Sequence, residues 1–422
     1  MYCDWGTKPV VVSCLFRENH VSSGGGLMVA GSAEVTLIDC VFSENTAGVF
    51  GGAIAGSTGP EIHAIGCRFE GNRAAAPGGA VMGTVGCTYV FIESEFIRNV
   101  TLGDGGGLYN SGGPTTLINC RFSDNSAQGY GGGVHGQSAK VDLVNCLFVG
   151  NRAENPLGAG GARSGGALSN QHGTLTATNC TFADNVAERS GGGFYHGVWS
   201  TTSTLTNCVF WNNRDEGGSD ENAQIFIDPA AAAPPAVTYS LIQGFTVDGP
   251  FNRDDSFLNV GDDPKFVDAA NRDFHLQSIS PAINLGNNTA VPPDTFDLDG
   301  DDHRIESTPF DLDGQPRFDG CVIDLGAFET TGAPLVRIVP ADLDGDCDVD
   351  TADLEVFIDC ATGASVAYGP GDLPATCRLP LDAQDLIAAD LDQDHDVDQT
   401  DFAVIQRCLS GENNPADTNC AN

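Results

Sequence analysis

The amino-acid sequence predicts an all-β, right-handed parallel solenoid, followed by a small, strongly acidic domain that contains helices. Two observations carry this prediction. A unit of about 26 to 28 residues recurs through the first half of the chain. From Asp342 onward the chain carries 19 acidic and 2 basic residues, out of 57 acidic and 19 basic residues in all. The chain therefore changes character near residue 340.

The repeat has the core Cys-x-Phe-x-x-Asn. Its Cys and Phe positions differ by two and share one face of a strand, so the Phe column is expected to pack inside the coil. The Asn lies at a bend, where its amide can bond to the backbone and to the same residue one coil away. Eight copies of the unit begin at Cys14, Cys40, Cys67, Ser94, Cys120, Cys146, Cys180 and Cys208.

A glycine cluster, such as Gly24 to Gly26, follows each copy except the last and allows a tight bend with positive φ. A short Thr/Leu/Ile/Val segment, such as Val35 to Ile38, then has strand composition and strand length. The period is too short for a propeller blade, and helical periodicity is missing. The remaining solution is a stack of coils about 4.8 Å apart, with right-handed crossovers.

This pattern resembles the right-handed parallel β-helix, or pectate-lyase-like, repeat proteins that are common among large secreted bacterial proteins. The resemblance covers residues 1–225 as coils and 226–330 as terminal coils and cap, the latter including Asp324-Leu-Gly-Ala-Phe-Glu329. Met1 aligns with Leu27, just after a glycine cluster, so the chain is expected to begin partway through a coil. An N-terminal truncation would explain why no secretion signal is readable. The resemblance implies an extracellular or cell-surface location.

The 15 cysteines fall into two classes. Column cysteines are expected to be free thiols that fill the core, because Ser94 and Ser240 occupy the same slot. Spacing alone would also allow disulfides there. Disulfides are favoured in the acidic tail, which has little apolar material, although one cysteine stays unpaired unless Cys321 joins them. The tail cysteines are Cys347, Cys360, Cys377, Cys408 and Cys420.

Two twelve-residue acidic loops carry the most specific chemical signal. Both place carboxylates at positions 1, 3, 5, 9 and 12, where oxygen ligands wrap a hard divalent cation, and position 7 contributes its backbone carbonyl. A solvated acidic tail is the alternative, which the shared spacing disfavours. Amphipathic segments at 354–358 and 402–407 are expected to be helical. The predicted metal ligands are Asp342, Asp344, Asp346, Asp348, Asp350, Asp353, Asp390, Asp392, Asp394, Asp396, Asp398 and Asp401.

This arrangement resembles the dockerin type I module, a duplicated calcium loop and helix that lacks the entering helix of a full EF-hand. The resemblance implies calcium as the cofactor and a cohesin-like protein as the partner of a domain at 341–422, after a linker at 331–340. Position 6 is Cys347 and His395 where glycine is usual, and position 12 is aspartate instead of glutamate. These departures bear on affinity more than on the choice of metal. Val349 and Val397, at position 8, are expected to pair the two loops through a short strand contact.

A weaker metal candidate lies in the predicted cap. Its sequence is Asp297-Leu-Asp299-Gly-Asp301-Asp302, echoed by Asp311-Leu-Asp313-Gly314. Position 12 is Thr308, which lacks a carboxylate. A metal site and an acidic turn are both open interpretations.

The net charge of −38 excludes nucleic acid as a partner, and the chain lacks the apolar run that a membrane span needs. Hydrolysis of a polysaccharide needs two positioned carboxylates, and lyase chemistry needs Arg or Lys beside bound calcium. Neither constellation is visible, and His135 and His196 are expected at the surface. The first hypothesis is a non-catalytic rod for carbohydrate or surface binding with a calcium-dependent docking tail. The alternative is a glycoside hydrolase or polysaccharide lyase attached to a scaffold through the dockerin.

Overall fold

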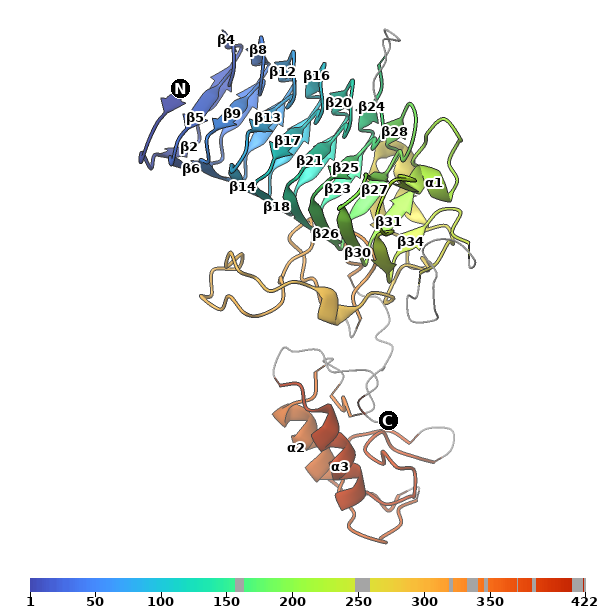
Figure 1. The fold of residues 1–422 in the computed structure, drawn as a ribbon. Coiled ribbons are helices and arrows are strands. Elements are labelled where there is room, and N and C mark those ends of the chain that lie inside the picture. The colour runs from blue at the N-terminus through green and yellow to red at the C-terminus, as the bar shows by residue number, and fades with distance from the viewer. Residues whose placement is uncertain are drawn as a thin grey trace. The chain divides into compact units, whose positions relative to one another are not determined.

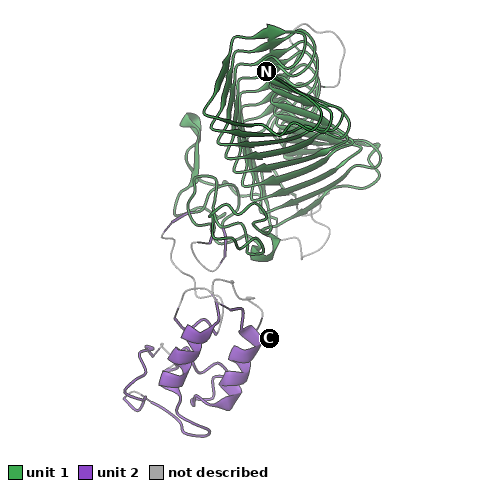
Figure 2. Ribbon diagram, turned by 90° about the vertical axis from the view of Figure 1, so that its left-hand side faces the viewer, with its two compact units in different colours: residues 1–317, 324–329 green, residues 318–323, 330–422 purple. Residues whose placement is uncertain are grey.

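The computed structural model describes residues 1–155, 163–246, 259–318, 322–331, 341–344, 348–369, 371–381, 385–411 and 420. Two compact units divide the chain: the first comprises residues 1–317 and 324–329, and the second 318–323 and 330–422. Figure 2 shows them in green and purple. The predicted linker at 331–340 lies outside the described residues apart from Thr331.

The first unit is a right-handed parallel β-solenoid, as predicted. Three parallel sheets of nine strands each build its coils (Figure 1). The first sheet consists of β1 (Tyr2–Cys3), β5 (Leu27–Ala30), β9 (Ile54–Ser57), β13 (Val81–Gly83), β17 (Leu108–Ser111), β21 (Val134–Gln137), β25 (Leu168–Gln171), β29 (Phe194–His196) and β32 (Ile225–Ile227). The second sheet consists of β2 (Val10–Val12), β6 (Glu34–Ile38), β10 (Glu61–Ile65), β14 (Thr88–Ile92), β18 (Pro114–Ile118), β22 (Lys140–Val144), β26 (Thr174–Thr178), β30 (Thr202–Thr206) and β33 (Ala236–Thr238).

The third sheet carries the Cys-x-Phe repeat, and a fourth sheet of two-residue strands follows its bend. The third sheet consists of β3 (Leu15–Arg17), β7 (Val41–Ser43), β11 (Arg68–Glu70), β15 (Glu95–Ile97), β19 (Arg121–Ser123), β23 (Leu147–Val149), β27 (Thr181–Ala183), β31 (Val209–Trp211) and β34 (Leu241–Ile242). The fourth consists of β4 (His20–Val21), β8 (Thr46–Ala47), β12 (Arg73–Ala74), β16 (Val100–Thr101), β20 (Ser126–Ala127), β24 (Arg152–Ala153) and β28 (Val186–Ala187).

The predicted Phe column lies on the inner face of the third sheet, in the core of the solenoid. From Phe42 to Phe210 its rings are fully buried, and consecutive rings stack with centroids 4.4 to 5.1 Å apart. This spacing matches the distance between neighbouring strands, so each ring contacts the next without a change of register. The Phe positions pair directly across the strands, as Phe69 does with Phe96.

The predicted Asn ladder is also present, and it runs along the bend between the third and fourth sheets. Asn99 donates through Nδ2 to Asn125 Oδ1 at 2.9 Å and to the carbonyl oxygen of Phe69 at 2.9 Å. The backbone N–H of Asn99 donates to the same Asn125 oxygen at 3.0 Å. The ladder ends at Asn213, whose Nδ2 donates to Gln224 Oε1 in α1 (Glu221–Gln224). Each rung thereby ties two coils together.

The column cysteines are free thiols, as predicted. Cys120 Sγ donates to the carbonyl oxygens of Ile118 and Phe91 at 3.3 and 3.4 Å. Ser94 Oγ makes the equivalent bond to Ile92 at 3.0 Å and accepts from the backbone N–H of Cys67 at 3.2 Å. Serine therefore substitutes for cysteine because both are small donors at this slot.

Glycine is required at the bends for two reasons. Gly51 has φ of +59°, a conformation that costs side-chain-bearing residues energy. A Cβ on the following Gly52 would lie 2.2 Å from the carbonyl oxygen of Gly79, one coil away. The clusters therefore serve both the bend and the close approach of neighbouring coils.

After the ninth coil the chain folds back over the outer faces of the sheets (Figure 1). It forms the antiparallel pair β35 (Phe266–Asp268) and β36 (Asp273–Leu276) and two 3₁₀ turns, η1 (Ala269–Asn271) and η2 (Asn288–Ala290). Phe274 and Phe328 pack against Leu147 and Val149 on the third sheet. Phe296 and Leu298 pack on the second sheet, as described below.

The second unit contains two ten-residue helices, α2 (Thr351–Cys360) and α3 (Gln399–Cys408), at the expected segments. Its apolar core is small and includes Val349, Phe357 and Ile405. Two disulfides, Cys360–Cys377 and Cys408–Cys420, tie the last residue of each helix to the chain that follows. They agree with the disulfides expected in this region, while Cys321 and Cys347 lie outside the described residues.

Candidate functional site

The two acidic loops of the second unit lead directly into α2 and α3. Position 9 of each loop is the N-cap of the helix, and position 12 completes a capping box. In the first loop, Asp350 accepts from the backbone N–H of Ala352, and Asp353 Oδ2 accepts from the N–H of Asp350 at 2.9 Å. An acidic residue at this place is favoured by the helix dipole as well as by a cation.

In the first loop the carboxylates converge. Asp342, Asp344 and Asp353 place one oxygen each within 4.8 Å of one another, and Asp348, Asp350 and Asp353 do the same. Asp342 and Asp353 are fully buried, so their charges are withdrawn from water. A hard cation with oxygen ligands at 2.3 to 2.6 Å would fit between carboxylates at this spacing. Asp346 lies outside the described residues.

The second loop has the same backbone pattern around position 12. Asp401 Oδ1 accepts from the N–H groups of Leu391 and Asp392 at 2.6 and 3.1 Å. Asp353 Oδ1 accepts from the corresponding Leu343 and Asp344 at 2.5 and 3.2 Å. The two predicted loops are therefore equivalent in conformation at this position as well as in sequence.

Hydrogen bonds hold both carboxylate oxygens of Asp390, at position 1 of the second loop. Asp390 Oδ1 accepts from the N–H of Asp394, and Asp390 Oδ2 accepts from His395 N–H at 3.0 Å and from Tyr368 Oη at 2.6 Å. These bonds orient Asp390, which is 4 % exposed, toward the loop interior. Tyr368 lies between the two loops, outside both twelve-residue patterns, so no sequence motif identifies it as a partner of Asp390.

Position 7 contributes a buried carboxylate that the sequence pattern did not require. Asp396 is 6 % exposed, and its Oδ2 accepts from the N–H of Ser365 at 2.6 Å. Its Oδ1 is buried and makes no hydrogen bond. Burial raises the pKa of Asp396 and of Asp401, because a desolvated carboxylate favours its neutral form when no cation is near.

Each loop forms hydrogen bonds to a residue that follows the opposite helix, and the two loops do not pair with each other where the structure describes them. The expected strand contact between Val349 and Val397 is wrong. The N–H of Val349 donates to Ser410 Oγ at 2.9 Å, and its carbonyl oxygen accepts from Ser410 N–H at 3.0 Å. Val397 makes the same two bonds to Thr362, at 2.9 and 3.0 Å. Each loop is thus fixed to the residue two positions after the opposite helix.

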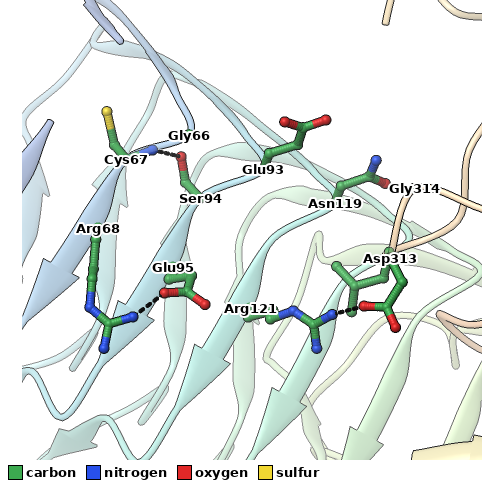
Figure 3. Close-up of a pocket in the computed structure, with 11 residues that line it drawn as sticks. Gly66, Cys67, Arg68, Glu93, Ser94, Glu95, Asn119, Arg121, Asp313 and Gly314 are labelled. Carbon is green, nitrogen blue, oxygen red and sulfur yellow. Dashed lines mark hydrogen bonds and ion pairs between the residues drawn. The ribbon is translucent and has the colours of Figure 1, made fainter. Parts of the chain in front are cut away.

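Figure 3 shows an open pocket on the first unit. It lies where the starts of β11, β15 and β19 face the returning chain at 312–314, and its volume is about 450 Å³. The residues that line it are Gly66, Cys67, Arg68, Glu93, Ser94, Glu95, Asn119, Arg121, Leu312, Asp313 and Gly314.

Ion pairs cross this pocket. Arg68 pairs with Glu95, and Arg121 with Asp313. Glycoside hydrolysis needs two carboxylates of which one donates a proton, whereas Glu95 and Asp313 each accept from a guanidinium. The pocket is therefore suited to hydrogen bonding with polar groups. Arg68, Glu95 and Arg121 occupy the outward-facing x position of the repeat, between Cys or Ser and Phe, and this shared position is the sequence signal that identifies them.

His135 and His196 are buried, so their expected surface position is wrong. His135 is 1 % exposed and stacks on Tyr109 and Tyr130, each at 5.5 Å between centroids. His196 is fully buried and contacts Ser203 Oγ and the carbonyl oxygen of Ala233, both at 3.0 Å. Burial lowers the pKa of both. Tyr109, one coil away, contacts His135, and Ala233, 37 residues further along the chain, contacts His196. The repeat pattern does not specify these contacts.

Comparisons with known proteins support the solenoid. The family model that describes the right-handed β-helix region matches residues 6–148. None of the curated proteins matches the chain. Within the described residues, no helix has the length and apolar character needed to cross a membrane.

Proposed function

We propose that the chain is a secreted or cell-surface β-helix rod for carbohydrate or surface binding, with a C-terminal module that docks a protein partner when it is loaded with calcium. The observation that carries the proposal is the pair of equivalent acidic loops, each hydrogen-bonded to a residue that follows the opposite helix. Such a unit responds as a whole to a cation bound at either loop.

Calcium suits the loops for reasons of charge and ligand type. Every predicted side-chain ligand is a carboxylate, and oxygen-rich, irregular ligand sets favour calcium over magnesium and zinc. The region from Asp342 onward carries a net charge of −17, which bound calcium would partly neutralise. Loaded loops would hold α2 and α3 in one arrangement, as a docking surface for a cohesin-like partner requires.

Calorimetry of the full chain during calcium titration tests the metal sites. We expect Asp342→Asn together with Asp390→Asn to abolish the tail's binding, since position 1 anchors each loop. Asp359→Asn is the matched control, because Asp359 is an exposed acidic residue of α2 outside the loops. Unchanged binding in the double variant would reject the calcium module. Capture of the chain by an immobilised cohesin-like module, in calcium and in chelator, tests docking separately.

A polysaccharide-degrading enzyme is the second candidate, favoured by the polar pocket of Figure 3. Incubation with plant and algal polysaccharides distinguishes the two. New reducing ends or unsaturated uronates that disappear in Glu95→Gln and Asp313→Asn, but persist in the exposed variant Glu44→Gln, would overturn the non-catalytic proposal. Binding without product is the result expected for the rod.

A further inference from the structure

A second acidic region lies on the first unit, in the loop between Pro292 and Thr308. Phe296 and Leu298 anchor this loop by packing on outward-facing apolar residues of the second sheet. These residues are Val90, Ile92, Ile118 and Val144. The acidic residues of the loop are thus held on a rigid support.

Backbone bonds close the base of the loop. The N–H of Asp294 donates to the carbonyl oxygen of Glu306 at 2.7 Å, and the N–H of Thr308 donates to that of Pro292 at 2.9 Å. Residues 293 and 307 form an antiparallel bridge. Asp294 and Glu306, which lie on either side of the motif, therefore face each other.

Carboxylates gather above this base. Asp294, Asp299 and Glu306 place one oxygen each within 4.8 Å of one another. Asp297, Asp299 and Asp301 form a second such group, so Asp299 belongs to both. A third group joins Asp301 and Glu306 to the exposed His303, whose Nδ1 lies 3.3 Å from Asp301 Oδ2. The carboxylates come from the predicted Asp-Leu-Asp-Gly-Asp sequence and from Asp294 and Glu306, which the motif did not include.

Two of these carboxylates carry a buried oxygen that lacks a hydrogen bond. Asp294 is 2 % exposed; its Oδ2 accepts from the N–H of Leu298 at 2.6 Å, and its Oδ1 has no partner. Glu306 Oε1 is also buried and has no hydrogen-bond partner. A buried carboxylate oxygen without a hydrogen bond or cation is costly. Arg304 Nη2 lies 3.9 Å from Asp297 Oδ2, at the rim, and forms no ion pair with Asp294 or Glu306.

The second copy of the motif, Asp311-Leu-Asp313-Gly314, shows how protein groups can bind such carboxylates. Asp313 pairs with Arg121 and with His275, and Asp311 accepts from the N–H groups of Asp313, Gln315 and Glu329. The same Asp-Leu-Asp-Gly sequence is therefore neutralised by protein groups at 311–314. At 297–300, Asp297 and Asp299 accept backbone N–H groups from Asp302 and Asp301 at 3.0 and 3.3 Å, and the one ion pair that the described residues make with them is that of Arg304 with Asp297 at 3.9 Å.

We infer that residues 294–306 bind a divalent cation, with Asp294, Asp297, Asp299, Asp301 and Glu306 as ligands, and that the cation clamps this loop onto the second sheet. Calcium is the cation that the all-oxygen, irregular ligand set favours. The site is independent of the tail loops, because the first unit supplies every ligand.

Equilibrium dialysis of the full chain against calcium chloride, with metal analysis, tests the site. In the Asp342→Asn, Asp390→Asn background we expect one bound calcium to remain. Adding Asp299→Asn should remove it, whereas adding Asp302→Asn should not, because Asp302 is in the same loop but in none of these groups. Zero calcium in the background chain, or equal effects of the two added variants, would overturn the inference.

Limited digestion with trypsin gives a second readout. Arg304 precedes Ile305, which is 94 % exposed, so this bond is accessible. We expect calcium to slow cleavage after Arg304 at least fivefold in the natural chain and in Asp302→Asn, but not in Asp299→Asn. Identical calcium dependence in both variants would reject the clamp, since any effect of calcium on trypsin itself is common to them.

Discussion

At the scale of single residues, the solenoid depends on side chains that repeat one hydrogen-bond geometry in every coil. Asn125 Oδ1 accepts from both the N–H and Nδ2 of Asn99, while its own Nδ2 donates to Asn151 and to the carbonyl oxygen of Phe96. All of these groups are buried. Asn is required because only an amide donates and accepts in this way.

Replacing Asn125 by Leu should therefore destabilise the first unit strongly. The change orphans at least two buried polar groups, each at a cost of about 1 to 3 kcal/mol. We expect a loss of about 3 kcal/mol or more, measured by urea unfolding. Asn19→Leu is the matched control, because Asn19 is an exposed end rung; a comparable loss there would contradict the ladder's role.

The buried histidines make stability depend on pH. Burial lowers the pKa of His135 and of His196 in the folded chain, so protonation favours the unfolded state. Their effect is absent above the unfolded pKa of about 6.5, and stability falls as the pH drops below it, by at most about 1.4 kcal/mol per pH unit for each histidine.

His135→Phe should keep the aromatic stack and reduce this acid sensitivity. Urea midpoints at pH 7 and pH 5 provide the measurement, and we expect a smaller difference between them than in the natural chain. His20→Gln, at an exposed position, should leave the difference unchanged. Equal pH dependence in all three chains would mean that His135 is not a contributor.

At the scale of elements, hydrogen bonds join each acidic loop to the end of the opposite helix. Thr362 follows α2 and holds the loop that precedes α3, while Ser410 follows α3 and holds the loop that precedes α2. A cation bound in one loop therefore restrains the segment that follows the other helix. The disulfides at Cys360 and Cys408 restrain the same two segments.

Thr362→Val removes the acceptor for the N–H of Val397 and should weaken the second loop. In the Asp342→Asn background, which leaves only that tail loop functional, we expect calcium affinity to fall about tenfold, equivalent to about 1.4 kcal/mol. Thr351→Val, at the exposed start of α2, is the control. Calorimetry that shows no difference between the two variants would contradict the coupling.

Sequence periodicity predicted the elements whose contacts repeat. The Phe, Asn and Cys columns were visible because each residue meets its own copy one coil away. The partner of Val349 was not predictable from the motif, since Ser410 lies 61 residues further along the chain. Glu306 was missed for a related reason: backbone pairing at the loop base, and not motif spacing, brings it to Asp294.

At the scale of the whole molecule, the two units are stabilised by different means. The nine free cysteines that the structure describes all lie in the first unit, where coil stacking buries a continuous core. Burial raises the pKa of one of them, Cys67, to about 12. The two disulfides of the described residues lie in the second unit, whose apolar core is small. Small domains commonly compensate in this way.

A reducing agent should therefore separate the two units in calorimetric unfolding of the full chain. Disulfides that close loops of this length contribute about 3 kcal/mol each, so dithiothreitol should lower the unfolding temperature of the second unit by more than 10 °C. The transition of the first unit should move by less than about 1 °C, because its thiols are already reduced. Cys360→Ser with Cys377→Ser should reproduce part of the effect without reductant. A shift of the first unit's transition on reduction would show that its column cysteines form disulfides after all.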